Sequence, residues 1–178
     1  MVRYFFYLVV ACALCANAAL ARLPNHTRTP GVINPDVTQE AIHQTICVSG
    51  WTATIRPPSS YTTKLKTQQI KEYRYKEKRL AEYEEDHLIS LQLGGHPTDP
   101  KNLWPQPYRI KCGARIKDTL ETRLKRMVCD GKLTLAEAQK AIATNWIAAY
   151  KNYIDKEGCA ELGRGINVER GANAYALY

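Results

Sequence analysis

The clearest hydrophobic pattern lies in the second half of the chain, where apolar residues recur every three or four positions. This spacing predicts a helix that begins after Gly113 and runs to Cys129, where Asp130-Gly131 ends it. The capping-box pattern Thr134-Leu135-Ala136-Glu137 then predicts a second helix to about Ile154. The apolar positions expected to face the core are Leu120, Leu124, Met127 and Val128 in the first helix and Leu135, Ala138, Ile142, Trp146, Ala149 and Tyr153 in the second.

Three shorter patterns precede these helices. Apolar residues at helical spacing predict a helix from Thr38 to about Cys47 and another from Thr62 to about Lys76. Between them, residues 49–58 alternate between apolar and polar positions, which predicts a strand and a turn that Pro57-Pro58 stops. The residues that carry these three patterns are Val37, Ala41, Ile42, Ile46, Trp51, Ala53, Ile55, Leu65, Gln69, Ile70 and Tyr73.

Two short strands are predicted in the middle of the chain. The segment from Tyr83 to Gly95 is typical of a strand that ends in a turn at its glycine pair, and Asn102 to Trp104 is typical of a second strand. Pro105 and Pro107 are expected to keep that strand short. We therefore expect one mostly helical α+β domain over residues 36–178, with a β-hairpin packed on the helix that ends at Cys129.

The N-terminal segment has the features of an export signal. Residues 1–21 begin with a single basic residue, Arg3, continue through an apolar run, and end in Ala19-Leu20-Ala21. The apolar run is shorter than the roughly 20 residues that span a bilayer, so a signal peptide is favoured over a membrane anchor. We expect a secreted or periplasmic protein without stable membrane insertion, in which residues 22–35 form an extended leader rich in Pro, Thr and Asn.

The cysteines fit an exported protein. Four of the six lie after the predicted signal peptide, and an even number in that setting predicts two disulfides, although spacing alone does not select among the three pairings. A zinc cluster is the alternative, but the four are widely spaced and contain no Cys-x-x-Cys pair. They are Cys47, Cys112, Cys129 and Cys159.

The charge of the chain favours a polyanionic partner. The formal net charge is +8 and the isoelectric point is near 9.2. Nucleic acid fits best, because Lys and Arg contacts to phosphate give affinity without reading sequence, although anionic envelopes and glycans also bind basic proteins. A solvated cationic helix face is the alternative for each basic cluster. The candidate phosphate contacts are Arg74, Lys76, Lys78, Arg79, Arg115 and Lys117.

Asp86 and His87 form the most informative pair for chemistry. A carboxylate offers the hard oxygen that divalent cations prefer, and an imidazole titrates near neutrality and is suited to taking a proton from water. Neighbouring residues of a strand point to opposite faces, so the two can share a site only if the strand ends or bends there. The pair indicates phosphodiester hydrolysis.

Residues from Glu84 to about Cys129 resemble the HNH endonuclease family and its ββα-metal motif, in the variant that opens with Asp-His. The resemblance rests on Asp86-His87-Leu88, the pair Gly94-Gly95, Asn102-Leu103 and a following helix. It implies a secreted, metal-dependent endonuclease (a hydrolase) of low sequence specificity that acts on DNA foremost, or on RNA. Cleavage of this kind leaves 5′-phosphate and 3′-hydroxyl ends.

The resemblance also implies roles for single residues. Asp86 would bind one divalent ion, Mg²⁺ or Mn²⁺ foremost and Zn²⁺ or Ni²⁺ otherwise, His87 would activate water, and Asn102 would brace the loop between the strands. We expect a backbone carbonyl near Asn102 to hold the far ring nitrogen of His87. The resemblance further implies a Cys47–Cys129 disulfide, which leaves Cys112 to pair with Cys159.

One departure from the family pattern affects this expectation. The family's helix usually supplies a His or Asn ligand, and the helix expected here has neither near its start; Asp118 or Glu121 would have to take that place. The alternative is a secreted polyanion-binding module that kept the scaffold and lost turnover. A third reading is an envelope protein that makes only protein contacts. The sequence identifies no inhibitor protein.

Overall fold

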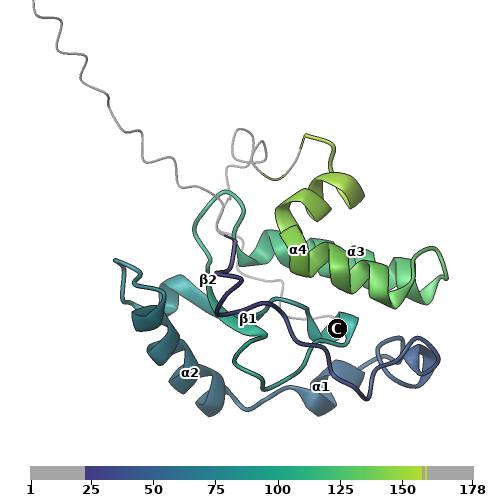
Figure 1. The fold of residues 1–178 in the computed structure, drawn as a ribbon, viewed down its shortest axis with the longest axis horizontal. Helices are drawn as coiled ribbons and strands as arrows, with labels where there is room; N and C mark the ends of the chain where they lie inside the picture. The colour runs from purple at the N-terminus through teal and green to yellow at the C-terminus, as the bar shows by residue number, and fades with distance from the viewer. Residues whose placement is uncertain (1–22, 158, 160–178) are drawn as a thin grey trace, which may run out of the picture.

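Two short antiparallel strands lie at the centre of the molecule, and helices flank them on both sides (Figure 1). The computed structural model describes residues 23–157 and Cys159, so the predicted signal peptide lies outside the described residues. The fold is a single compact α+β domain, as expected. The described elements in chain order are η1 (Ile42–Gln44), α1 (Trp51–Ile55), α2 (Ser59–Glu72), η2 (Leu80–Glu82), β1 (Tyr83–His87), η3 (Leu91–Leu93), β2 (Leu103–Pro107), α3 (Ala114–Cys129) and α4 (Leu135–Tyr153).

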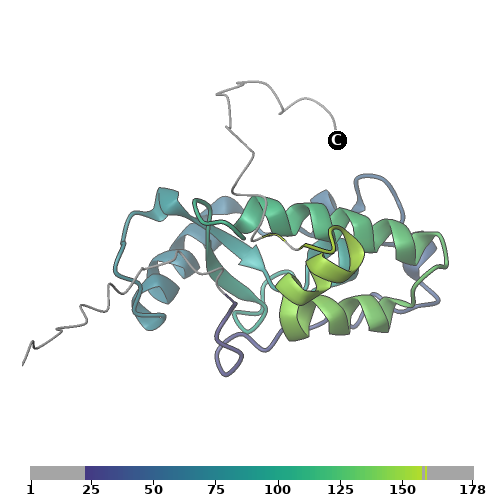
Figure 2. The ribbon, with the colours of Figure 1, turned by 90° about the horizontal axis from the view of Figure 1, so that it is seen from above.

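Helices α3 and α4 pack side by side and carry most of the core (Figure 2). Both follow the predicted apolar stripes, and the predicted capping box at Thr134 and Glu137 is present. Tyr150 is buried where the pattern pointed to Tyr153, which is only half-buried. The difference follows from a break at Asn145 (φ −163°, ψ 92°), which rotates the last turns of α4 relative to the first.

Helix α2 lies on the other side of the hairpin from α3 and α4 (Figures 1 and 2). It is shifted toward the N-terminus relative to the predicted range 62–76. It begins directly after Pro58, whose extended backbone precedes the first turn, and ends at Glu72 because Arg74 takes a left-handed conformation (φ 54°). Tyr75 and Tyr83 stack at 5.1 Å between ring centroids and attach the end of α2 to β1.

The predicted strand over residues 49–58 is wrong, because this segment forms helix α1. Gly50 turns the chain with a left-handed backbone (φ 78°), and Trp51 then packs against the core cluster. The described sheet contains only β1 and β2, and this segment pairs with neither. Three apolar residues at alternate positions within a five-residue segment fit a short helix as well as a strand. Packing of the Trp51 indole on the core decides in favour of the helix. The predicted stop at Pro57-Pro58 is correct.

The predicted helix over residues 38–47 is reduced to the short 3-10 helix η1 and turns. The expected anchors of this segment, Val37, Ile42 and Ile46, are nevertheless buried. The apolar spacing therefore identified which side chains enter the core but not the backbone conformation.

Strand β2 is longer than expected and contains both prolines. Pro105 lies opposite Glu85, and Pro107 lies opposite Tyr83. The flanking hydrogen bonds from Leu88 N to Asn102 O and from Tyr108 N to Glu82 O place the prolines at alternate positions, where no N–H is needed for the ladder. The prolines are therefore compatible with the strand.

Two disulfides close the domain, in the pairing that the resemblance implied. Cys47–Cys129 ties the chain before α1 to the end of α3, and Cys112–Cys159 ties the start of α3 to the segment after α4. Residues 23–35 also join the body, since Gly31 N donates to Lys101 O at 3.0 Å and Asn34 N donates to Gly94 O at 2.8 Å. In the part of the chain that the structure describes, no helix has the length and apolar character needed to cross a membrane.

Candidate functional site

Strand β1 presents acidic and basic groups to both sides of the hairpin. Its last four residues are Glu84, Glu85, Asp86 and His87, and the strand ends at His87. Alternation directs Glu84 and Asp86 toward α3, where Asp86 is bonded, whereas Glu85 lies within electrostatic reach of Lys66 on α2. The hairpin is therefore the point where α2 and α3 meet a run of charged residues.

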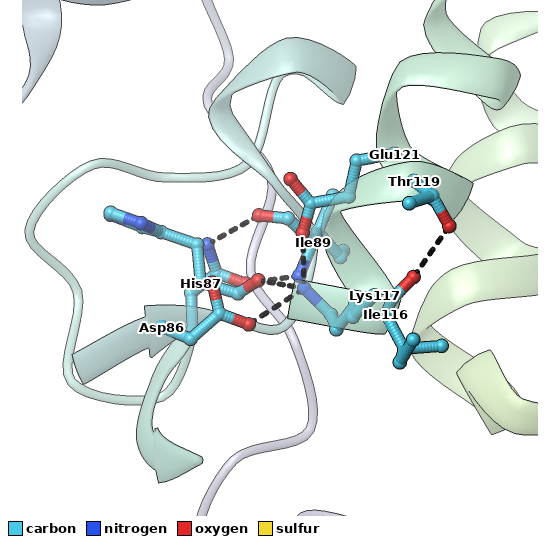
Figure 3. Close-up of polar contacts among 8 residues, drawn as sticks. Asp86, His87, Ile89, Ile116, Lys117, Thr119 and Glu121 are labelled. Carbon is cyan, nitrogen blue, oxygen red and sulfur yellow. Dashed lines mark hydrogen bonds and ion pairs between the residues drawn. The ribbon is translucent and has the colours of Figure 1, made fainter. Parts of the chain in front are cut away.

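Lys117 of α3 lies on the side of the hairpin that Asp86 faces, at the centre of a group of polar contacts (Figure 3). Its ammonium donates to Asp86 Oδ2 at 2.8 Å, to the backbone oxygen of His87 at 2.7 Å and to Glu121 Oε1 at 2.5 Å. The residue is 0% exposed. An ammonium has three N–H donors, so all of them are used by these three oxygens, which come from the strand and from the next turn of α3.

The carboxylates around Lys117 outnumber it. Burial alone would lower the pKa of Lys117, but Asp86 and Glu121 outweigh burial and raise it, so the ammonium stays charged. Burial and the neighbouring carboxylates raise the pKa of Glu121 despite Lys117 and raise that of Glu84 to about 7. Asp118 is an exposed residue, but partial desolvation of its carboxylate and the nearby Asp86 raise its pKa as well. The raised pKa of Lys117 and the raised pKa values of the carboxyl groups have one cause, because a single positive charge is shared among four acidic groups. We call Glu84, Asp86, Asp118 and Glu121 the acidic cluster.

His87 is held by one ring nitrogen. Its Nε2 lies 2.9 Å from the backbone oxygen of Pro97, five residues before Asn102, as expected. A carbonyl oxygen only accepts, so Nε2 carries the proton and Nδ1 keeps a lone pair in the neutral ring. Burial lowers the pKa of His87, which favours that neutral form. The ring is therefore preset to accept a proton at Nδ1.

Asn102 braces the loop between the strands, as the resemblance implied. Its amide nitrogen donates to the backbone oxygens of Ile89 and His96, and its Oδ1 accepts from Ile89 N, with distances of 3.0 Å in each case. Gly95 lies against the same loop, where a Cβ would come within 1.7 Å of Ile89 O. The fixed loop holds Pro97, and through it His87.

The three expected metal ligands do not form a metal site as they are arranged. Asp86 and Glu121 both bond to Lys117, and Asp118 lies on the exposed side of α3. Within residues 23–157 and Cys159, no group of three or more His, Cys, Asp or Glu side chains is placed to hold a metal ion. The residues present therefore do not fit the divalent ion that the resemblance implied, because an ammonium stands between its would-be ligands.

The predicted phosphate contact at Lys117 is wrong, because a fully buried side chain cannot reach a nucleic-acid backbone. The other five candidates are exposed. Arg79 forms ion pairs with Glu77 and Glu82, and the Arg115 guanidinium lies 5.9 Å from the centre of the Tyr108 ring. The exposed candidates are Arg74, Lys76, Lys78, Arg79 and Arg115.

Sequence reasoning missed the site roles of three residues, Lys117, Glu84 and Arg56. Lys117 lies four positions before Glu121 on α3, a spacing that puts both on one helix face, and Glu84 precedes Asp86 by two positions on β1. Arg56, which is exposed, lies close enough to lower the pKa values of Glu84 and Asp118 in opposition to burial. Only the first two relations have a signal in the sequence.

Glu85 differs from the acidic cluster. It is buried, and neither carboxylate oxygen has a hydrogen-bond partner among the described residues. Burial raises its pKa to about 8, and Lys66 only partly opposes this.

Comparison of the chain with protein-family models, curated proteins and solved structures finds no match in any of the three. The geometry of the hairpin and α3 is therefore the basis on which a function is proposed.

Proposed function

We propose that this chain is an exported phosphodiesterase of the HNH type that cleaves nucleic acid, DNA or RNA, and that His87 is its general base. The observation that carries the proposal is the hydrogen bond between His87 Nε2 and Pro97 O. This bond fixes the tautomer in which Nδ1 can take a proton from water, which is the task of a general base in phosphodiester hydrolysis.

The surroundings of His87 support this role. Lys117 donates to the His87 backbone oxygen, and Asn102 fixes the loop that carries Pro97. The base is therefore held from two sides by groups that are themselves buried. Lys117 does not reach the substrate in this scheme and acts as a positioning residue.

Substrate would be held by the exposed basic residues. Arg74, Lys76, Lys78 and Arg115 provide positive charge on surfaces next to the hairpin, where contacts to phosphate give affinity that depends on salt and not on base sequence. Low sequence specificity follows from this mode of binding.

A plasmid-nicking assay with the purified protein tests the proposal. His87→Ala is expected to lower cleavage by roughly a hundredfold or more, because general-base catalysis contributes on that order. His43→Ala is the matched control, since His43 is exposed on η1 and is expected to leave cleavage unchanged. Unchanged cleavage in the His87→Ala protein would show that this site is not the active site.

The same assay with and without a chelator, and with added Mg²⁺ or Mn²⁺, asks separately whether a divalent ion takes part, as the resemblance implied. The assignment of His87 does not depend on the result of that arm.

A polyanion-binding module without turnover is the second candidate. The low exposure of the site favours it, since Asp86 is 8% and His87 is 6% exposed. This alternative predicts salt-dependent DNA binding in which His87→Ala has no effect, together with no nicking under any condition of the assay.

A further inference from the structure

We infer that the Lys117 ammonium is the resident cation of the acidic cluster: it fills the position of a divalent metal, closes the native site to metal ions, and leaves a cation site behind when its side chain is shortened. The inference concerns which cation the site holds, and it stands whether or not the chain cleaves nucleic acid.

The donor atoms around Lys117 are those of a site for a hard cation. All three are oxygens, namely a strand carboxylate (Asp86), a helix carboxylate (Glu121) and a backbone carbonyl (His87). Carboxylate and carbonyl oxygens are the ligands that Mg²⁺ and Ca²⁺ take in proteins. The ammonium therefore occupies an oxygen cage brought together by two secondary-structure elements.

The carboxyl groups at the cage outnumber the one ammonium that it holds. Asp86 and Glu121 bond to Lys117 directly, and Glu84 and Asp118 act on the same groups electrostatically. Crowded carboxyl groups disfavour one another's ionised forms, and a divalent cation would favour ionisation of more of them than one ammonium does. Removing the single positive charge makes the demand for a cation larger.

The burial of Lys117 explains why metal does not compete in the native protein. The ammonium is fully buried and uses all three donors, so a metal ion would have to displace it and leave a second buried charge without partners. The ammonium is covalently attached to α3, which gives this cation a high effective concentration at the site compared with a metal ion from solution.

Manganese binding to the full chain tests the inference, with the EPR signal of free Mn²⁺ as readout. Lys117→Ala is expected to bind one Mn²⁺ at least about tenfold more tightly than the unsubstituted protein. The double variant Lys117→Ala/Glu121→Gln keeps the shortened side chain and loses one ligand, so the gain is expected to disappear. Equal Mn²⁺ affinity in Lys117→Ala and the unsubstituted protein would overturn the inference.

The unsubstituted protein provides a test that does not require the variant to fold. A buried ammonium that uses all its donors exchanges its protons slowly, so a ¹⁵N-detected NMR signal from the Lys117 ammonium is expected. Its absence from the spectrum of Lys117→Arg assigns the signal to Lys117. Saturating Mg²⁺ is expected to leave this signal in place. Loss or a large shift of the signal on adding Mg²⁺ would show that metal displaces the lysine, and the inference would be wrong. Neither readout measures cleavage, so a result that overturns this inference can be told apart from a result that overturns the proposed nuclease activity.

Discussion

At the scale of single residues, Lys117 and Glu85 are both ionisable groups in the interior, but only Lys117 has partners. Lys117 has three oxygens within 2.5–2.8 Å, and its pKa is raised. Glu85 has no hydrogen bond to either oxygen among the described residues, and burial raises its pKa to about 8. A buried charge without partners favours the neutral form, so Glu85 is expected to carry a proton at neutral pH.

This state of Glu85 makes stability depend on pH. Its pKa in the folded protein (about 8) lies above the ordinary value of 4.5, so the folded state binds the proton more tightly than the unfolded state. The stability linked to this proton is fully present below about pH 4.5 and is lost as pH rises through about 8.

Glu85→Gln removes this dependence, because an amide of the same shape does not ionise. We expect the variant to exceed the unsubstituted protein in free energy of unfolding by roughly 2 to 4 kcal/mol above pH 8, and to match it near pH 4.5. Urea unfolding at the two pH values measures the difference. Glu40→Gln, at an exposed position, is the control and is expected to show no such gain. Equal curves at high pH would show that Glu85 is solvated or paired.

At the scale of elements, the loop from β1 to β2 positions the proposed base. Asn102 bonds to three backbone groups in it, and Gly95 packs directly against Ile89 and Asn102. The Gly95 backbone approaches so closely that a side chain has no room. Loop geometry, and with it the Pro97 carbonyl that bonds His87, therefore depends on this glycine.

Gly95→Ala is expected to lower the free energy of unfolding by about 3 kcal/mol or more, because its Cβ would lie 1.7 Å from Ile89 O and the backbone must move. Gly131→Ala is the matched control: Gly131 has a left-handed backbone (φ 68°) but no atom within 4 Å of an added Cβ. It is expected to cost only about 1 to 2 kcal/mol. Chemical denaturation of both variants compares them, and similar losses would argue against the close approach at Gly95.

The elements also show where local patterns were sufficient. Helices α3 and α4 were predicted because each carries a long apolar stripe, and most of their core residues were identified with them, whereas Met127 and Tyr153 are only half-buried. Helix α1 was mistaken for a strand because five residues contain too little periodicity to separate a helical turn from an alternation. The prolines of β2 were expected to end it, but its pairing leaves their positions free of ladder hydrogen bonds.

At the scale of the whole molecule, two disulfides join distant parts of the chain. Cys47–Cys129 closes 82 residues and Cys112–Cys159 closes 47. In the chain-entropy account each bridge stabilises by restricting the unfolded chain, and the effect grows slowly with loop length. Both bridges hold an end of α3, the helix that carries Lys117 and Glu121.

Removal of each bridge by paired serine substitutions is expected to cost about 4 kcal/mol, with the Cys47/Cys129 pair costing about 0.5 kcal/mol more than the Cys112/Cys159 pair. Urea unfolding of the two double variants measures both losses. Because each pair loses one bridge and gains two hydroxyls, each variant is the control for the other. A clearly larger loss from the Cys112/Cys159 pair would show that native contacts outweigh loop length.

The sequence by itself determined the long helices, the hairpin with its Asp86-His87 pair, and the basic charge, because each depends on local spacing or composition. The tertiary structure alone decided the surroundings of that pair. A lysine on an amphipathic helix is expected at the surface, since the sequence does not record which segment covers each helix face. Asp86 lies 31 positions before Lys117, and only when β1 packs on α3 do its carboxylate and the His87 carbonyl supply the oxygens that make burial of the ammonium favourable.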